Sequence, residues 1–380
     1  MSFSVDSLMH ALCQYRKNYF PRVSPRVIGK TRLSNCKTAV EPPSPLSVFR
    51  PDDCSTRPQL TSPCDPVPRH DKSCFSGCHS GCVLAIVLLC VFDGQTISLD
   101  GVIRMCDFPV AKKPPLILGE EAVGIVERNG AGFKAGERVI VYGGGMGVFR
   151  DGTWAETVAV PASSLRRLPD AISFAEGAAL TNVGVTAYSA LRVAELKTGE
   201  MLIVLGATGG VGSASVQIGK AIGVRVIAVV STAGKAAKLR ALGADHVIAL
   251  SDGPLAEQVQ ELTGSKGADV ILDTVGGDVT GRALSSLASF GRLVHLGYVA
   301  GTKLTIDSLE LIAKPSTIIG FNILLVPAER SAKDLDEVIA LAGQAKYRAV
   351  VDKTFPMSEV VEATRYLDER TAVGKVVLAF

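Results

Sequence analysis

The second half of the chain alternates short, mainly apolar runs with longer stretches of helical spacing. After the first run, Val211, Ala214, Ile218 and Ala221 recur at steps of three and four, on one face of a helix. Strands that are apolar on both faces and separated by helices are typical of a parallel sheet covered on both sides. We therefore predict an α/β doubly wound sheet with strands at 201–206, 225–230, 246–250, 268–273 and 291–297.

The region from about residue 115 to 170 has a different pattern. The runs AVGIVERNG, GERVIVYG and GTWAETVAVP are short, rich in β-forming residues and separated by glycines, as in a small barrel or sandwich. Near the C-terminus, 331–343 and 357–370 have the spacing of amphipathic helices, and the closing GKVVLAF is predicted to be a strand.

Residues 1–82 are rich in Ser, Pro, Cys and Arg, and prolines interrupt every candidate element. We predict an irregular or disordered segment, extended to residue 94. Its CFSGCHSGC stretch (Cys74, Cys78, His79, Cys82) lacks the paired C-x-x-C spacing of zinc knuckles and the C-x-x-C-H spacing of haem attachment. A cysteine-rich segment without a ligand is favoured over a metal or haem site.

The composition of the chain limits the kinds of molecule that it can be expected to bind. The chain has 380 residues, enough for two domains, and 47% of them are apolar. A net charge of +3 without a basic block argues against nucleic acid. The apolar run 83–92 is too short to span a bilayer, and no charged segment leads into an apolar one at the N-terminus. We expect a cytoplasmic protein that does not bind membranes.

The stretch LGATGGVG is the strongest functional signal. Gly206, Gly209 and Gly212 follow a predicted strand at steps of three and open a predicted helix, which is the context of a dinucleotide-binding loop. Glycine permits the turn and the close approach of a pyrophosphate, and the helix start offers free N–H donors. A tight turn without a ligand is the alternative.

The end of the next strand indicates which dinucleotide binds. NAD-binding units usually have an acid here to hold the ribose 2′-OH. This chain has Ser231 and then Lys235, a hydroxyl and an ammonium that suit a 2′-phosphate. NADPH is the predicted cofactor, although Lys235 could also be a solvated lysine at a helix start.

With these motifs, the chain from about residue 95 to 380 resembles the medium-chain dehydrogenase/reductase superfamily, in particular its zinc-independent quinone oxidoreductase-like branch. The resemblance rests on PPLILGEEAVGIV, GERVIVYGGG, GTWAETVAVP, GVTAYSAL, VLGATGGVG, DVILDTVGG, GRLVHLG and ERTAVGKVVL, in the family order. It implies a Rossmann domain (185–320) inserted in a GroES-like β-barrel domain (95–184 and 321–380), after an irregular segment (1–94). A homodimer joined through the Rossmann sheet edges is also implied.

The resemblance further implies cofactor contacts at the carboxyl ends of strands. These are Thr186 near the nicotinamide; Gly206, Gly209, Gly210, Val211 and Gly212 in the pyrophosphate loop; Ser231 and Lys235 at the 2′-phosphate; Thr274, Gly297 and Tyr298 after later strands; Phe321 and Asn322 near the nicotinamide; and Arg370 closing over the cofactor.

The zinc-binding relatives read Gly-His-Glu where this chain reads Gly119-Glu120-Glu121, and they have a cysteine at the position of Asn182. The cysteine loop that holds their structural zinc is also replaced. We therefore predict no metal, and a structural role for Glu121 as part of the remaining frame. The family's N-terminal strands and substrate-orienting segment are altered around Ser98 and Arg104, so the barrel is predicted to be incomplete there.

The predicted function is an NADPH-dependent, zinc-independent oxidoreductase that transfers hydride to a quinone or an α,β-unsaturated carbonyl. No catalytic side chain is assigned; Tyr142 and Tyr188 are candidates only by family location and are interpreted as core residues. One alternative is an enoyl reductase of fatty-acid or polyketide type. Another is a nucleotide-binding protein with impaired catalysis.

Overall fold

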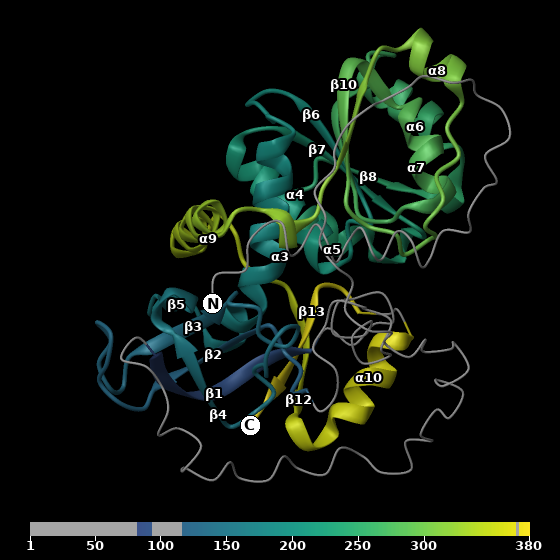
Figure 1. Cartoon of the computed structure of the whole chain (residues 1–380). Helices are drawn as coiled ribbons and strands as arrows, with labels where there is room; N and C mark the ends of the chain where they lie inside the picture. The colour runs from purple at the N-terminus through teal and green to yellow at the C-terminus, as the bar shows by residue number, and fades with distance from the viewer. Residues whose placement is uncertain (1–81, 93–115, 370–371) are drawn as a thin grey trace, which may run out of the picture. The chain divides into compact units, whose positions relative to one another are not determined.

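A computed structural model describes residues 82–92, 116–369 and 372–380. Six parallel strands form one sheet in the order β11-β10-β9-β6-β7-β8 (Figure 1). This is the doubly wound order, and it reverses between β6 and β9. The strands are β6 (Met201–Leu205), β7 (Arg225–Val230), β8 (His246–Ala249), β9 (Ala268–Asp273), β10 (Leu287–His295) and β11 (Thr317–Gly320).

The helices α4, α6 and α7 between these strands bury apolar side chains against the sheet. In α4, Ala214 and Ile218 are fully buried and Val211 is partly buried, as the sequence spacing predicts. Strand side chains are buried on both faces, because helices cover both. The predicted parallel sheet is confirmed. Its helices are α4 (Gly210–Ile222), α5 (Ala236–Ala241), α6 (Leu255–Thr263), α7 (Gly277–Leu284) and α8 (Ser308–Ala313).

A second sheet has seven strands, in the order β12-β13-β1-β2-β3-β5, with β4 paired to β1. The strands are β1 (Cys82–Phe92), β2 (Glu121–Val126), β3 (Arg138–Tyr142), β4 (Thr157–Pro161), β5 (Leu165–Arg167), β12 (Val351–Pro356) and β13 (Lys375–Ala379). Apolar side chains of β2, β3, β4, β5, β12 and β13 and of α10 (Val360–Asp368) form a separate core cluster, including Val139, Phe355 and Leu378.

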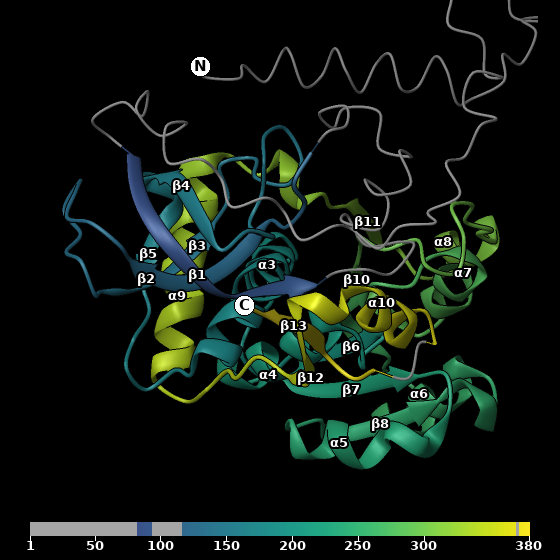
Figure 2. The same cartoon turned by 90° about the horizontal axis from the view of Figure 1, so that it is seen from below.

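Strand β1 corrects one prediction. The irregular segment was expected to reach residue 94, but Cys82–Phe92 is a strand paired with β4, β2 and β13. Figure 2 shows it running from β4 to β13. The last proline before it is Pro68, so nothing in CVLAIVLLCVF prevents an extended strand. Its partners lie far along the chain, and the local pattern does not reveal them. Cys74, Cys78, His79, Ser98 and Arg104 lie outside the described residues.

Helix α3 (Phe174–Val193) links the two sheets. It begins at a capping box in which Ser173 and Glu176 satisfy each other's backbone N–H groups. The predicted domain boundary between residues 184 and 185 falls inside this helix, so the boundaries remain a prediction. Helix α9 (Ala328–Gly343) packs beside α3, where buried Asp334 accepts hydrogen bonds from Ser189 and Arg192.

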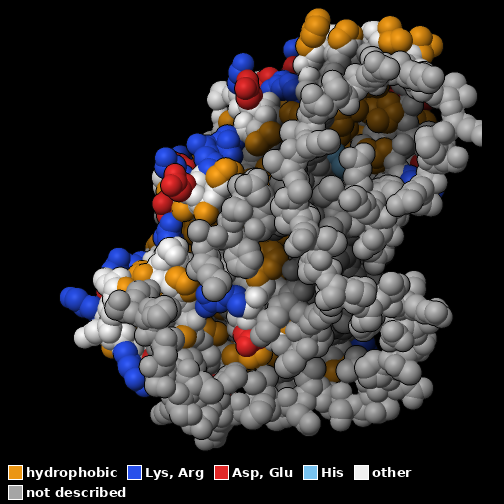
Figure 3. All heavy atoms as spheres, viewed as in Figure 1, with side chains coloured by type: hydrophobic (Ala, Val, Ile, Leu, Met, Phe, Trp, Pro, Cys, Tyr) orange, Lys and Arg blue, Asp and Glu red, His pale blue; other side chains and the backbone are white. Residues whose placement is uncertain are grey.

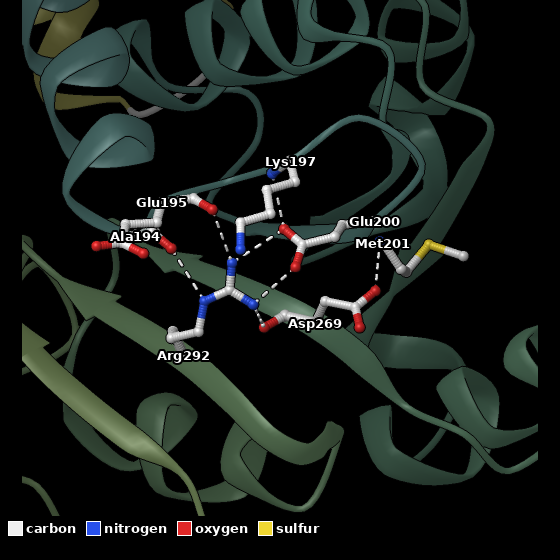
Figure 4. A network of polar contacts seen from close by, with 7 residues as sticks. All are labelled: Ala194, Glu195, Lys197, Glu200, Met201, Asp269 and Arg292. Atoms are coloured by element: carbon white, nitrogen blue, oxygen red, sulfur yellow. Dashed lines mark hydrogen bonds and ion pairs between the residues drawn. The ribbon is translucent and has the colours of Figure 1, made fainter.

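Arg292 of β10 fixes the end of α3 to the parallel sheet (Figure 4). Its guanidinium donates to the carbonyls of Ala194 (2.9 Å) and Glu195 (3.1 Å), which follow the helix. It also forms a bidentate ion pair with Glu200, with both N–O distances 2.9 Å. Burial alone would raise the pKa of Glu200, but Arg292 and the Lys197 N–H hold it below its ordinary value. None of the helices in the described part of the chain is long and apolar enough to cross a membrane.

Candidate active site

The glycine loop between β6 and α4 has the shape of a dinucleotide-binding turn. Gly206 has φ +72°, a conformation that glycine adopts without strain. Gly209 is exposed and caps α4 in extended conformation, without a side-chain hydrogen bond. The first N–H groups of the helix that follows have no carbonyl partner within it, so they are available to an anion.

Gly212 shows why this loop tolerates no larger residue inside. A β-carbon on Gly212 would lie 2.2 Å from the Gly206 carbonyl oxygen, well below any real contact. The helix therefore packs directly on the turn, as the third glycine of the motif requires. A β-carbon on Gly210 would lie 2.7 Å from Val183 and 3.0 Å from the stem of Lys375, so β13 also lies against the loop. These close approaches fit a pyrophosphate-binding loop.

Thr274 and Gly297 lie together at the carboxyl edge of the sheet. The Thr274 hydroxyl donates to the Leu205 carbonyl (2.8 Å), and a β-carbon on Gly297 would lie 2.0 Å from the Thr274 carbonyl oxygen. A β-carbon on Gly206 would also lie 2.5 Å from the Thr274 hydroxyl. The structure thus brings these three predicted residues into one cluster at the strand-order reversal, the usual ligand position in such sheets.

Asp273 organises this cluster, and the sequence reasoning did not assign it a role. Its buried carboxylate accepts hydrogen bonds from the N–H groups of Val275 (2.9 Å) and Gly276 (3.0 Å) and from the Thr280 hydroxyl (2.5 Å). The Nδ1 of His295 lies 2.7 Å from it. Asp273 therefore fixes the turn that carries Thr274. An acid ending the apolar run ADVILD is the signal that could have identified it.

The predicted 2′-phosphate residues follow β7. Ser231 is exposed directly after the strand, and Lys235 lies just before α5. The Lys235 ammonium donates to the Ala372 carbonyl (3.3 Å), and the Gly374 N–H donates to the Thr208 carbonyl (3.0 Å). The segment before β13 therefore contacts both the glycine loop and Lys235.

The remaining predicted residues are more scattered. Thr186 is buried within α3, and Tyr298 is half-exposed after β10. Phe321 packs partly buried against the core after β11, while Asn322 is exposed and its side chain caps the short 3-10 helix that follows. All of the predicted cofactor contacts stay predictions, and Arg370 lies outside the described residues.

Glu121 is a buried acid whose partners explain it. Only 3% of it is exposed, and its carboxylate accepts hydrogen bonds from the Thr181 hydroxyl and the Asn182 N–H (2.6 Å). The buried Lys375 ammonium lies 3.8 Å from its other oxygen. Through these contacts the carboxylate joins β2 to α3 and β13, which is a structural role. Lys375, whose stem packs on Gly210, is a site residue that the sequence reasoning missed.

Tyr142 lies opposite Glu121 in the β2–β3 ladder. Burial raises the pKa of its phenol, and the charges of Glu121 and Glu120 add to that effect despite a hydrogen bond with Ser331. The phenol therefore keeps its proton at ordinary pH. Among the residues that the structure describes, no three His, Cys, Asp or Glu side chains are grouped so as to hold a metal ion. Metal independence stays a prediction.

Comparisons with known proteins agree with this geometry. The alcohol dehydrogenase GroES-like domain family matches residues 85–170, and the zinc-binding dehydrogenase family matches residues 210–344. A 2-haloacrylate reductase from a Burkholderia species is 30% identical over 279 residues, which cover 71% of this chain and 82% of that protein. The chain belongs to the medium-chain dehydrogenase/reductase superfamily.

Within the superfamily it falls in the quinone oxidoreductase-like branch, and it is an oxidoreductase. The crystal structure of Escherichia coli quinone oxidoreductase complexed with NADPH has a TM-score of 0.69 and 28% identity, and the match covers 79% of this chain and 92% of that one. The predicted fold class, a Rossmann sheet with a GroES-like domain, is confirmed. A nicotinamide cofactor is supported.

A reducing polyketide synthase from Floropilus chiversii is 31% identical over 281 residues, or 69% of this chain. The chain spans 11% of the length of that synthase. A highly reducing polyketide synthase from Gibberella zeae matches in the same way, again over 11% of its length.

Proposed function

We propose that this protein is an NADPH-dependent reductase of quinones or α,β-unsaturated carbonyl compounds that works without zinc. The glycine loop carries the cofactor part of the proposal, because Gly212 lets α4 pack directly on the turn, as the third glycine of a dinucleotide-binding loop does. The similarity to a 2-haloacrylate reductase supports an activated carbon–carbon double bond as the acceptor, since 2-haloacrylate is an α,β-unsaturated acid.

The chain's own residues would bind and orient the cofactor and exclude water from it. Gly209, Gly210 and Val211 would hold the pyrophosphate at the start of α4, and Ser231 and Lys235 the 2′-phosphate. When bound, the reduced nicotinamide supplies a hydride to an electrophilic carbon of the substrate.

The buried acid is not a proton donor in this proposal. Glu121 is held by Thr181, Asn182 and Lys375, and we assign its carboxylate to the frame that joins β2 to α3 and β13. The protonated Tyr142 phenol is hydrogen-bonded to Ser331, and we assign it no catalytic role.

The test is the loss of reduced-nicotinamide absorbance when the protein is mixed with NADPH and a small quinone, an enone or a 2-haloacrylate. Nucleotide binding is measured in parallel by fluorescence quenching. Turnover of at least one acceptor is expected. Binding of NADPH without turnover of any acceptor would instead favour a nucleotide-binding protein with impaired catalysis. Metal analysis of the purified protein tests the zinc prediction, and a stoichiometric metal would contradict it.

An enoyl reductase is the second candidate, and the polyketide synthase similarity specifically favours it. It would use the same cofactor site and differ in substrate. Comparing an enoyl thioester with the free quinone separates the two: faster turnover of the thioester would assign the chain to the enoyl reductases.

We also propose a homodimer joined at the edge of the parallel sheet. β11 is an edge strand of this sheet, and such an edge can pair with a second copy. Ile318 on it, and Leu309 and Ile312 on α8, are exposed, and Figure 3 shows hydrophobic side chains gathered at the top over α8. Light scattering should give a dimer for the wild type and a monomer for Ile318→Lys. The exposed Leu262 provides the control, because Leu262→Lys should stay dimeric.

A further inference from the structure

Two lysines lie three residues apart at the start of α5, on the same side of the helix turn. Lys235 donates to the Ala372 carbonyl, as described above. Lys238 is exposed and extends to the second sheet, where its ammonium lies 3.4 Å from a carboxylate oxygen of Asp352. The predicted 2′-phosphate region is therefore bordered by a strand from the other sheet.

Asp352 is held firmly in this position. It lies on β12, and only 11% of its side chain is exposed. Besides Lys238, the Tyr366 hydroxyl of α10 donates to its second oxygen, and this hydrogen bond raises the pKa of the Tyr366 phenol. The acid also acts on the other lysine: burial lowers the pKa of Lys235, while the charge of Asp352 opposes that shift. Both lysines lie in the field of this one carboxylate.

The chemistry of an acid at this point is specific. A carboxylate beside the adenosine ribose accepts a hydrogen bond from a 2′-OH and repels a 2′-phosphate, which is how NAD-binding units select their cofactor. Such units carry the acid at the end of the second strand, where this chain has Ser231. Here the acid comes from a residue 121 positions further along the chain, on a different sheet.

We propose that Asp352 is a specificity-determining residue that offsets the lysines, weakens NADPH relative to NADH, and lets the protein accept both cofactors. The proposal rests on the proposed function, because it concerns the same nucleotide site. Asp352 acts by its charge at that site and partly through its ion pair with Lys238.

The test measures dissociation constants of NADPH and NADH by fluorescence quenching, without any substrate. Asp352→Asn should lower the dissociation constant of NADPH about fivefold, which is the usual size of a partly screened charge interaction. The dissociation constant of NADH should stay unchanged or rise. Asp336→Asn is the matched control. It also removes the acid of an ion pair, the one between Asp336 and Arg166, but Asp336 lies on α9 and not at the predicted 2′-phosphate region. It should leave the NADPH to NADH ratio unchanged.

A second pair of variants separates the charge of Asp352 from a direct phosphate contact by Lys238. Lys238→Met leaves Asp352 in place, so it also tests the proposal if Asp352→Asn does not fold: unchanged NADPH affinity in Lys238→Met would then contradict the proposal. Lys238→Met replaces an exposed residue and leaves Asp352 without that counter-ion, so NADPH should weaken while NADH does not. Adding Asp352→Asn to Lys238→Met should restore NADPH affinity. If the double variant binds NADPH as weakly as Lys238→Met alone, Lys238 itself holds the phosphate and the proposal is wrong. An unchanged ratio in Asp352→Asn would also overturn it. Failure of wild-type protein to bind either cofactor would instead contradict the proposed function.

Discussion

The glycine loop and the Glu121 centre lie against each other through Lys375, yet they are built in opposite ways. The loop is made of backbone: Gly206, Gly209 and Gly212 shape a turn whose N–H groups are the proposed ligand-binding part. The Glu121 centre is made of side chains and one backbone N–H drawn from β2, α3 and β13. A local spacing can specify the first, whereas only the tertiary fold can assemble the second.

This difference makes distinct predictions for the two regions. The side-chain centre should depend on charge pairing, because removing one partner leaves the other buried and unpaired. The three loop glycines should depend on space alone, because they have no side chains to lose.

The largest expected effect comes from breaking the buried ion pair. Lys375→Met should lower the free energy of unfolding by about 3 kcal/mol, since Glu121 loses its cation in a buried site. Denaturant unfolding measures this, with Lys346→Met, an exposed lysine, as the control. Adding Glu121→Gln should recover part of the loss. If the double variant lost the sum of both single effects, the two groups would not be coupled.

The next largest effect comes from adding one methyl group to the glycine loop. Gly212→Ala should destabilise the fold by about 2 kcal/mol and abolish nucleotide binding, because the new β-carbon meets the Gly206 carbonyl oxygen. Gly209→Ala is the control: its β-carbon would lie 3.5 Å from the same oxygen, an ordinary contact. Equal stability of the two variants would show that close helix packing is not what Gly212 provides.

A smaller effect is expected from Lys235, the side chain that we propose contacts the 2′-phosphate of NADPH. Lys235→Glu should weaken the binding of NADPH about tenfold, which is roughly 1.4 kcal/mol of binding free energy. The binding of NADH should weaken much less. The measurement is the same fluorescence titration, with the exposed Lys266→Glu as a control for net charge. Unchanged NADPH affinity would remove the argument from Ser231 and Lys235.

The smallest effect lies at the Arg292–Glu200 pair. The pKa of Glu200 is held below its ordinary value of 4.5, so the pair stabilises the fold above that pH and loses its contribution as pH falls through the lowered pKa. Glu200→Gln should therefore cost about 1 kcal/mol at neutral pH. The difference from wild type should shrink in acid below about pH 4. A difference that stayed constant with pH would point to packing rather than charge.

The parallel sheet was predictable because its information is local. The strands at 201–206, 225–230 and 268–273 are mainly apolar, and α4 repeats its buried positions at helical spacing. The irregular segment predicted through residue 94 failed at β1 for the opposite reason. Cys82–Phe92 is defined as a strand by pairing with β2, β4 and β13, up to 290 residues away in the chain.

The candidate site divides in the same way. The sequence by itself determined the glycine loop, the absence of an acid after β7 and the loss of the metal-ligand pattern around Glu120, because each depends on residue type at fixed spacing. Only the tertiary structure decided that Lys375 neutralises Glu121, that Asp273 fixes the Thr274 turn and that Asp352 borders Lys235 and Lys238. A charge acts through space over several ångströms, so its partners are set by the fold and not by their order in the chain.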